Sequence, residues 1–203
     1  YLDGSNIPES VYDNLIKVVH ENMDLMYRYV RLRKKSLGVE ELHMYDIYAP
    51  IAKAPSKKYS FEEAKTIVKE GLAPMGEEYL SKLQEGFDNR WIDVYENEGK
   101  RSGAYSWGAY GTHPYVLLNF QGTLDHVFTL AHEMGHALHS YYSDANQTYI
   151  NAGYKIFVAE VASTCNESLL IHDLLKKTKD KETRAYLINH FLEQFKGTLY
   201  RQT

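Results

Sequence analysis

The sequence predicts a mainly α-helical fold with one small β element near its middle. Apolar residues recur three and four positions apart through most of the 203 residues, which is the spacing of amphipathic helices. Residues 91–121 instead combine β-branched and aromatic residues with four glycines, which favours short strands and turns. Three parts therefore follow in order: a helical part at 1–90, the β element at 91–121 and a second group of helices at 122–203.

The first helix is predicted over residues 10–37, as one long amphipathic segment that ends near Gly38. A basic run can bind nucleic acid, but cations also stabilise the C-terminus of a helix. The net charge of −4 gives no support to a nucleic-acid or anionic-membrane partner, so we favour the second interpretation. The basic run in the last turns of this helix comprises Arg28, Arg31, Arg33, Lys34 and Lys35.

Two more helices are predicted in the first part. Prolines at positions 50 and 55 exclude a long helix from the connection at residues 40–54. Ser60, followed three residues later by Glu63, is typical of a capping box and predicts a helix that runs to Gly71. Another helix is predicted from about residue 74 to residue 87.

The β element is predicted to hold a short strand or hairpin, a glycine-containing loop and a strand at residues 115–120. If one edge of this strand is open beside a functional site, an extended peptide could pair with it by strand addition. Tyr115, Leu117 and the nearby His113 are then candidate substrate-binding residues. A buried packing strand is the alternative.

The third part is predicted to begin with a helix at residues 124–142, with Thr123 as its N-cap. The turn-rich residues 143–153 are predicted to form a loop. Residues 154–175 again show helical spacing and could pack antiparallel beside the preceding helix. A final helix is predicted over residues 181–199.

A metal-binding motif, H-E-x-x-H, lies in the helix at 124–142, where His132 and His136 enclose Glu133. Two histidines four residues apart are about 40° apart around a helix and about 6 Å apart along it, so one cation can bind both. The glutamate can then reach a metal-bound water, which is the arrangement of zinc peptidases. Gly135 costs roughly 1 kcal/mol against alanine, which indicates that another segment approaches closely. Two incidental histidines on a charged helical face are the alternative.

A third ligand is expected from the helix at residues 154–175, because a catalytic zinc ion has three protein ligands and one position for water. Glu160 is the candidate ligand, and Glu167, two turns further on the same face, could accept a hydrogen bond from a ligand histidine. His139 lies about 10 Å along its helix from His132, so it is expected to support the site by hydrogen bonding. Both glutamates could instead face solvent, but their apolar neighbours argue against this.

Composition limits the class of protein further. The single cysteine, Cys165, excludes an internal disulfide and is expected to be buried on its helix. No apolar run approaches the roughly 18 residues of a membrane span, and no signal-like start is visible, which favours a cytoplasmic location. The sequence starts without methionine and ends directly after a helical pattern, so we expect one partial catalytic domain over residues 1–203.

These motifs resemble one known family. The segments HEMGHALHSYYS and IFVAEVASTCNE are similar to the zinc region of the oligoendopeptidase F branch of the thimet oligopeptidase family of metallopeptidases. The segments KRSGAYS and PYVLLNF resemble that family too. The resemblance implies a helical, zincin-like catalytic region with one zinc ion per chain, which hydrolyses short peptides in the cytoplasm.

The resemblance also implies roles for single residues. His132, His136 and Glu160 match the zinc ligands of the family. Glu133 matches the carboxylate that activates a zinc-bound water, and Glu167 matches a supporting acid. Family members are longer, and the tyrosine and histidine residues that stabilise their tetrahedral intermediate lie downstream of the zinc helices. The expected partners are therefore short peptide substrates and the remaining segments of the same enzyme.

Two other functions stay open beside a zinc endopeptidase. A zinc-stabilised or peptide-binding helical fragment would show no turnover, and a purely structural zinc site would close with a fourth protein ligand and would not need Glu133. A zinc carboxypeptidase can use the same motif with a later glutamate. Product analysis on a peptide blocked at both termini would separate the carboxypeptidase from the endopeptidase.

Overall fold

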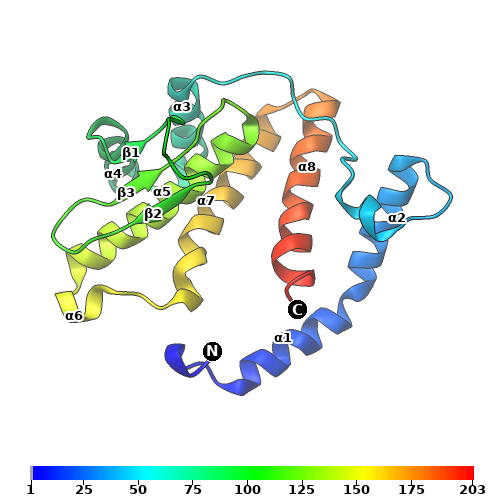
Figure 1. The fold of residues 1–203 in the computed structure, drawn as a ribbon, viewed down its shortest axis with the longest axis horizontal. Helices are drawn as coiled ribbons and strands as arrows, with labels where there is room; N and C mark the ends of the chain where they lie inside the picture. The colour runs from blue at the N-terminus through cyan, green and yellow to red at the C-terminus, as the bar shows by residue number, and fades with distance from the viewer. Residues whose placement is uncertain (1) are drawn as a thin grey trace. The chain divides into compact units, whose positions relative to one another are not determined.

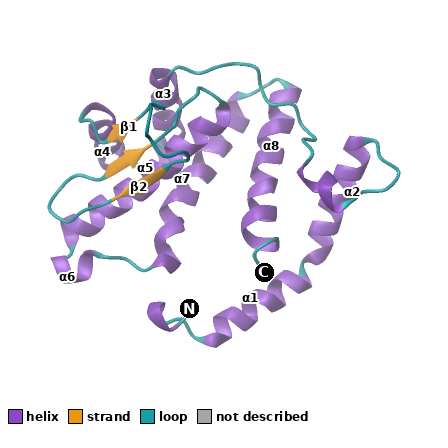
Figure 2. Cartoon of the chain, in the orientation of Figure 1, coloured by secondary structure: helices purple, strands orange, loops and turns teal. Residues whose placement is uncertain are grey.

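The structure, a computed structural model, describes residues 2–203. Within these residues the fold is mainly helical with one small three-stranded sheet, as predicted (Figures 1 and 2). The chain divides into two compact units: residues 2–55 with 178–203, and the continuous segment 56–177. No helix of residues 2–203 is both long enough and apolar enough to cross a membrane.

The first unit consists of three helices and shorter helical turns. The prediction of one long helix over residues 10–37 is wrong, because Asn22 leaves the helical conformation with φ −112° and ψ 16°. Its side-chain amide donates to the Val18 carbonyl oxygen over 2.8 Å and so caps the first helix instead of continuing it. The elements of this unit are η1 (Asp3–Ser5), α1 (Glu9–Glu21), α2 (Met23–Leu37), η2 (Met44–Tyr48), α8 (Lys181–Phe195) and the π-helical turn η4 (Lys196–Tyr200).

Arg33 in α2 shows that the basic run is not a continuous surface patch. Its side chain is 2% exposed, and Nη1 lies 3.1 Å from Glu193 Oε1 on α8. Nη2 donates to the carbonyl oxygens of Asp46 and Ala49, at 2.9 and 2.5 Å. The guanidinium therefore holds the connection after α2 against two helices of the first unit.

The second unit holds the sheet and a layer of longer helices. The predicted capping box is confirmed, because the Glu63 N–H donates to Ser60 Oγ and the Ser60 N–H donates to the Glu63 carboxylate. Figure 1 shows α5 and α7 running side by side, with α3 packed against both. The elements are α3 (Phe61–Gly71), η3 (Ala73–Met75), α4 (Glu77–Asp88), β1 (Ile92–Asp93), β2 (Tyr105–Trp107), β3 (Tyr115–Leu117), α5 (Leu124–Asn146), α6 (Tyr149–Ala152) and α7 (Ile156–Lys177).

The sheet has the order β1-β3-β2, with β1 parallel and β2 antiparallel to β3. The strand predicted at residues 115–120 is shorter, but hydrogen bonds continue beyond its end. The Leu118 N–H donates to the carbonyl oxygen of Asp93 in β1, and the Phe120 N–H donates to that of Val94, just after β1. Since β3 is the central strand, it has no open edge for strand addition, and the alternative of a packing strand agrees with its place in the sheet. Within the described sheet, β1 and β2 are the edge strands.

Two further predictions in the second unit are wrong. Residues 143–146 continue α5, and α6 follows almost at once, so residues 143–153 are not simply a loop. The polar side chains there satisfy local hydrogen bonds, as Asn146 donates to the Tyr142 carbonyl oxygen over 2.8 Å. Cys165 on α7 is exposed, not buried, because it lies on the side of the helix that no element of this unit covers.

Candidate metal centre

Helix α5 is the buried centre of the second unit and carries the H-E-x-x-H motif. Thr123 is its N-cap, as predicted, because its side chain accepts a hydrogen bond from the His126 N–H. Glu133 is only 6% exposed, whereas His132 and His136 are partly exposed on one side of the helix. The buried apolar side chains of α5 include Leu124, Val127, Phe128, Leu130, Ala131, Met134, Ala137 and Leu138.

Gly135 lies where α5 and α7 approach each other most closely. A Cβ at this position would stand 2.7 Å from Ser163 Cα and 2.9 Å from the Ala162 carbonyl oxygen. Those are backbone atoms, so a side chain at position 135 would force the two helices apart. The prediction that a glycine between the two histidines marks a close approach is therefore confirmed, and the neighbour is α7.

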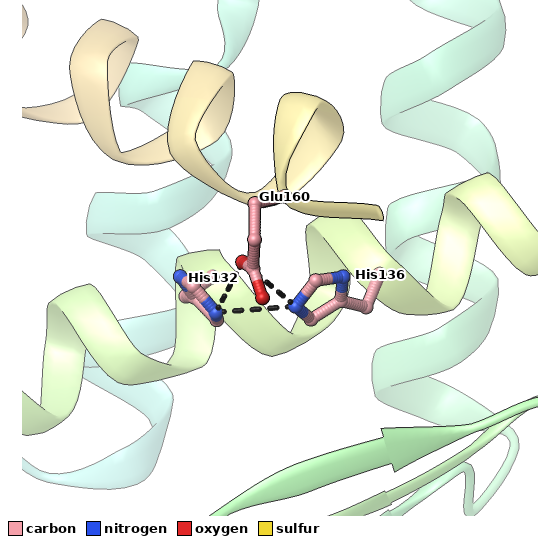
Figure 3. Close-up of side chains that lie close together, drawn as sticks. All are labelled: His132, His136 and Glu160. Carbon is pink, nitrogen blue, oxygen red and sulfur yellow. Dashed lines mark hydrogen bonds and ion pairs between the residues drawn. The ribbon is translucent and has the colours of Figure 1, made fainter. Parts of the chain in front are cut away.

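Three potential ligand atoms from α5 and α7 meet beside this contact. The Nε2 atoms of His132 and His136 are 3.2 Å apart. Glu160 Oε2 on α7 lies 3.4 Å from the first and 3.3 Å from the second. In Figure 3 the Glu160 side chain reaches down from α7 toward the two imidazoles of α5. The helix pair thus brings together the three residues that the sequence assigned to the metal.

The spacing of these atoms fits a tetrahedral zinc site. When metal–ligand bonds are about 2.0–2.1 Å long, neighbouring ligands of a tetrahedron are about 3.3–3.4 Å apart. The three observed separations are 3.2, 3.3 and 3.4 Å. Two imidazole nitrogens and one carboxylate oxygen are also suitable donors for zinc, and three protein ligands leave one position for water or substrate.

Glu167 contacts the other side of the His132 ring. Its Oε1 is 2.5 Å from His132 Nδ1, and its side chain is 12% exposed. A proton on Nδ1 that is donated to this carboxylate leaves Nε2 with a free lone pair directed at the cluster. Burial by itself lowers the pKa of His132, but the hydrogen bond and charge of Glu167, with the charges of Glu133 and Glu160, outweigh burial and raise it.

Burial also changes the pKa of the neighbouring groups on α5. It raises the pKa of Glu133 to about 6, with further contributions from the charges of Glu160 and Glu167 and an opposing one from His132. It lowers the pKa of His136, which therefore favours the neutral form that binds metals. Glu133 is thus mostly ionised at neutral pH, and burial favours the neutral form of His136.

Glu160 is held differently from what its neighbours in the sequence indicated. Its side chain is 62% exposed. The surrounding apolar residues are exposed as well, with Ile156 at 81%, Phe157 at 60% and Val161 at 64%. The expectation that Glu160 sits on a largely buried helix is wrong, because most side chains in the first turns of α7 are exposed.

His139 lies one turn beyond the ligands and contacts none of them by a hydrogen bond among the described residues. Its ring stacks on Tyr154, with ring centroids 3.8 Å apart, and its Nδ1 is buried without a hydrogen-bond partner there. Tyr154 Oη also lies 2.9 Å from Ser140 Oγ. Burial lowers the pKa of His139. The ring therefore packs the end of the α6–α7 connection against α5.

The candidate substrate residues of the β element do not join the cluster. His113 stacks on Trp91, with ring centroids 5.6 Å apart, and its ring is tilted by 45° against that of Tyr115, 4.5 Å away. Val116 is buried and Tyr115 is 51% exposed, so Tyr115 and Leu117 point to the sheet face opposite Val116. Since α5 packs against the sheet on the side of its buried residues, this outer face is turned away from the metal helix.

Two buried polar residues of α7 support the centre and were not assigned a role from the sequence. Ser163 Oγ donates to Glu160 Oε2 over 2.7 Å. Asn166 Nδ2 donates to the Ala131 carbonyl oxygen over 2.9 Å, and Tyr79 of α4 donates to Asn166 Oδ1 over 2.9 Å. Their spacing of three residues on the face of Glu160 and Glu167 was the available signal.

Two bacterial oligopeptidases are close relatives of the chain in sequence. Oligopeptidase PepF of Bacillus subtilis (strain 168) is 54% identical over 202 residues, which are 100% of this chain and 30% of that protein. The Oligoendopeptidase F homolog of Lactococcus lactis subsp. lactis (strain IL1403) is 49% identical over 202 residues, again 100% of this chain and 33% of that protein. The chain thus spans about a third of the length of the curated relatives it matches.

Two solved structures are similar to the chain in both fold and sequence. Oligoendopeptidase-F from Enterococcus faecium is 38% identical with a TM-score of 0.67, over 99% of this chain and 28% of that one. A crystal structure from Chlamydophila abortus is 44% identical with a TM-score of 0.91, over 99% of this chain and 34% of that one. Residues 2–203 also match the sequence profile of Peptidase family M3. The resemblance seen in the sequence is confirmed, and the chain belongs to peptidase family M3.

Proposed function

We propose that this chain carries the metal centre of a zinc endopeptidase that hydrolyses short oligopeptides. In this proposal His132, His136 and Glu160 hold one zinc ion, and Glu133 transfers the proton. The observation that supports it most strongly is that three suitable donor atoms converge at tetrahedral spacing. The buried carboxylate of Glu133 belongs to the residue directly after the ligand His132. The names of the relatives, oligopeptidase and oligoendopeptidase, support the same substrate class.

The chemistry divides between the ion and the side chains. Zinc, when bound, would polarise the scissile carbonyl and make water a stronger nucleophile at neutral pH. Glu133 would accept the proton from the attacking water and pass it to the leaving amine. A carboxylate with a pKa of about 6 suits both steps, because it is mostly ionised at neutral pH yet can carry a proton transiently.

Glu167 would keep His132 in the right tautomer and orientation. A carboxylate on Nδ1 makes Nε2 the metal-facing nitrogen and increases its basicity. The 2.5 Å contact between Glu167 Oε1 and His132 Nδ1 supports this role.

The peptide substrate would pair with β2 instead of β3. Strand β2 is an edge of the sheet and packs against α5, whereas both edges of β3 are occupied. Main-chain hydrogen bonds to an edge strand orient a peptide without regard to its side chains. This assignment replaces Tyr115 and Leu117 as substrate contacts with the backbone of Tyr105–Trp107.

Further segments of the full-length enzyme would complete the site. The matched relatives are about three times as long as the part this chain covers. The family resemblance assigns stabilisation of the tetrahedral intermediate to segments downstream of α7. A cytoplasmic location is part of the proposal and is tested by cell fractionation.

Glu133→Gln in the full-length enzyme tests the proposal. The variant should keep one zinc ion per chain but lose at least about a hundredfold in kcat/KM on an internally quenched peptide blocked at both termini, because the amide cannot accept the proton. Glu98→Gln, at an exposed position of the loop between β1 and β2, is the matched control and should keep wild-type activity. Cleavage by Glu133→Gln at the wild-type rate would remove the proposed role of Glu133.

The same assay separates the other two candidates. Release of single C-terminal residues from unblocked peptides, with no cleavage of the blocked one, would indicate a carboxypeptidase. Zinc binding by wild type with no cleavage of either peptide would indicate a binding module.

A further inference from the structure

The most exposed ligand of the cluster depends on something other than burial for its orientation. The Glu160 side chain is 62% exposed, whereas those of His132 and His136 are 25% and 17% exposed. A glutamate at the surface loses rotamer freedom when it is held in one conformation, and this costs on the order of 1–2 kcal/mol. Glu160 therefore needs a partner that favours the conformation directed at the imidazoles.

Ser163 is that partner. Its hydroxyl lies 2.7 Å from Glu160 Oε2, the same oxygen that faces both imidazole nitrogens. The residue is fully buried, so water does not compete for its hydroxyl. A hydrogen bond to an ionised carboxylate is shorter and stronger than one between neutral groups. One lone pair of Oε2 can thus accept from Ser163 while another is directed at the metal position.

Ser163 is itself fixed by the contact between α5 and α7. Its Cα lies at the position where Gly135 has no side chain, 2.7 Å from an ideal Cβ there. Gly135 stands between the two histidines on α5. The backbone contact thus sets the distance between the hydroxyl of Ser163 and the imidazoles, and the hydroxyl in turn sets the carboxylate of Glu160.

We propose that Ser163 is a positioning residue, which holds the Glu160 carboxylate ready to bind the metal through its buried hydroxyl. This inference rests on the proposed zinc site and adds to it the group that preorganises the third ligand. Preorganisation raises metal affinity because the entropy of ordering the carboxylate is lost on folding and not on binding.

A serine in a helix can also simply donate to its own backbone. Ser163 Oγ lies 3.1 Å from the Glu160 carbonyl oxygen, which would satisfy the hydroxyl without any role at the metal. The neighbouring Thr164 shows that purely backbone role, because its Oγ1 donates to the same carbonyl oxygen over 2.5 Å. Thr164 therefore offers a matched control for the loss of a hydroxyl.

The test compares Ser163→Ala with Thr164→Ala in the full-length enzyme. Alanine keeps the Cβ of Ser163 and adds no atom to the contact with Gly135. Zinc affinity is measured by competition with a chromophoric chelator, and the ligand field by the visible absorption of the cobalt-substituted protein. We expect Ser163→Ala to bind zinc about tenfold or more weakly and to shift the cobalt spectrum, since loss of an outer partner of a ligand typically costs 10–100-fold in affinity. Thr164→Ala should stay within about twofold of wild type.

A second comparison keeps the inference testable if Ser163→Ala also lowers the stability of the metal-free protein. In a Glu160→Ala background the Ser163 hydroxyl has no carboxylate to hold, so adding Ser163→Ala should not change zinc affinity further. Equal zinc affinity of Ser163→Ala and wild type, or an equal loss in both backgrounds, would overturn the inference. Absence of zinc binding by wild type would instead overturn the proposed metal centre itself.

Discussion

At the scale of single residues, the centre is a set of polar groups that each need a partner. Glu167 is the partner of His132, with 2.5 Å between Oε1 and Nδ1. Glu167→Gln keeps an acceptor oxygen but removes the charge, so zinc affinity should fall by about tenfold. Glu167→Ala leaves the buried Nδ1–H without this acceptor and should lower affinity further. Chelator competition on both variants and wild type measures these differences. Equal zinc affinity of Glu167→Gln and wild type would show that the charge of Glu167 has no role.

Tyr79 links the stability of the second unit to alkaline pH. Burial raises the pKa of Tyr79 to about 12, against the lowering effect of its hydrogen bond to Asn166. The unfolded chain therefore loses this proton first, and the free energy of unfolding contributed by Tyr79 is present below pH about 10 and is lost as the pH rises toward about 12.

Urea unfolding at pH 9 and pH 11 measures this effect. Tyr79→Phe should lose less stability between the two pH values than wild type, because phenylalanine has no proton to release. Tyr95→Phe, at an exposed tyrosine, is the control and should follow wild type. Parallel losses in wild type and Tyr79→Phe would contradict the assignment.

At the scale of elements, the contact between α5 and α7 determines whether the ligands meet. Gly135→Ala would place a methyl group 2.7 Å from Ser163 Cα. The better helix propensity of alanine, about 1 kcal/mol, should be outweighed by overpacking of roughly 1–3 kcal/mol and by separation of the helices. We expect lower stability and at least tenfold weaker zinc binding, because a small shift misplaces Glu160.

Gly197→Ala provides the matched control for helix propensity. A Cβ at Gly197, in the π-helical turn after α8, would meet no atom within 4 Å. This variant should be neutral or slightly more stable in thermal unfolding, with unchanged zinc affinity. Unchanged zinc affinity in Gly135→Ala would show that the close approach is not needed for the metal site.

At the scale of the whole molecule, the two units have separate determinants of stability. Arg33 is 2% exposed and pairs with Glu193 within the first unit. Arg33→Met removes the buried partner of a partly exposed ion pair and two hydrogen bonds to carbonyl oxygens, so it should lower the free energy of unfolding by about 1–3 kcal/mol. Arg31→Met, at an exposed position on the same helix, should stay within about 0.5 kcal/mol of wild type.

Zinc affinity of the folded Arg33→Met protein is the second measurement. The ligands all belong to the second unit, and Arg33 bonds only groups of the first among its described contacts. Affinity equal to wild type is therefore expected. A large loss of affinity would show that the metal centre depends on the first unit.

The local sequence pattern was sufficient to predict structure where the interacting residues are close together in the sequence. The capping box at Ser60 and the N-cap at Thr123 were predicted because each involves hydrogen bonds across three residues. The single helix over residues 10–37 and the loop at 143–153 were both predicted wrongly, because in each segment the polar side chains did not act as the local pattern indicated. A polar side chain at Asn22 ended a helix whose apolar spacing continued, and polar residues after Tyr142 bonded along the helix instead of breaking it.

The sequence by itself determined the motif, the helices that carry it and the family, because helical spacing alone brings His132 and His136 to one face. Only the tertiary structure decided which carboxylate oxygen faces the imidazoles, that Ser163 holds it, and that β3 is the central strand. These facts depend on how α5, α7 and the sheet pack. Exposure and pairing between distant segments follow from that packing and leave no local signal, which is why the exposed Glu160 looked buried in the sequence.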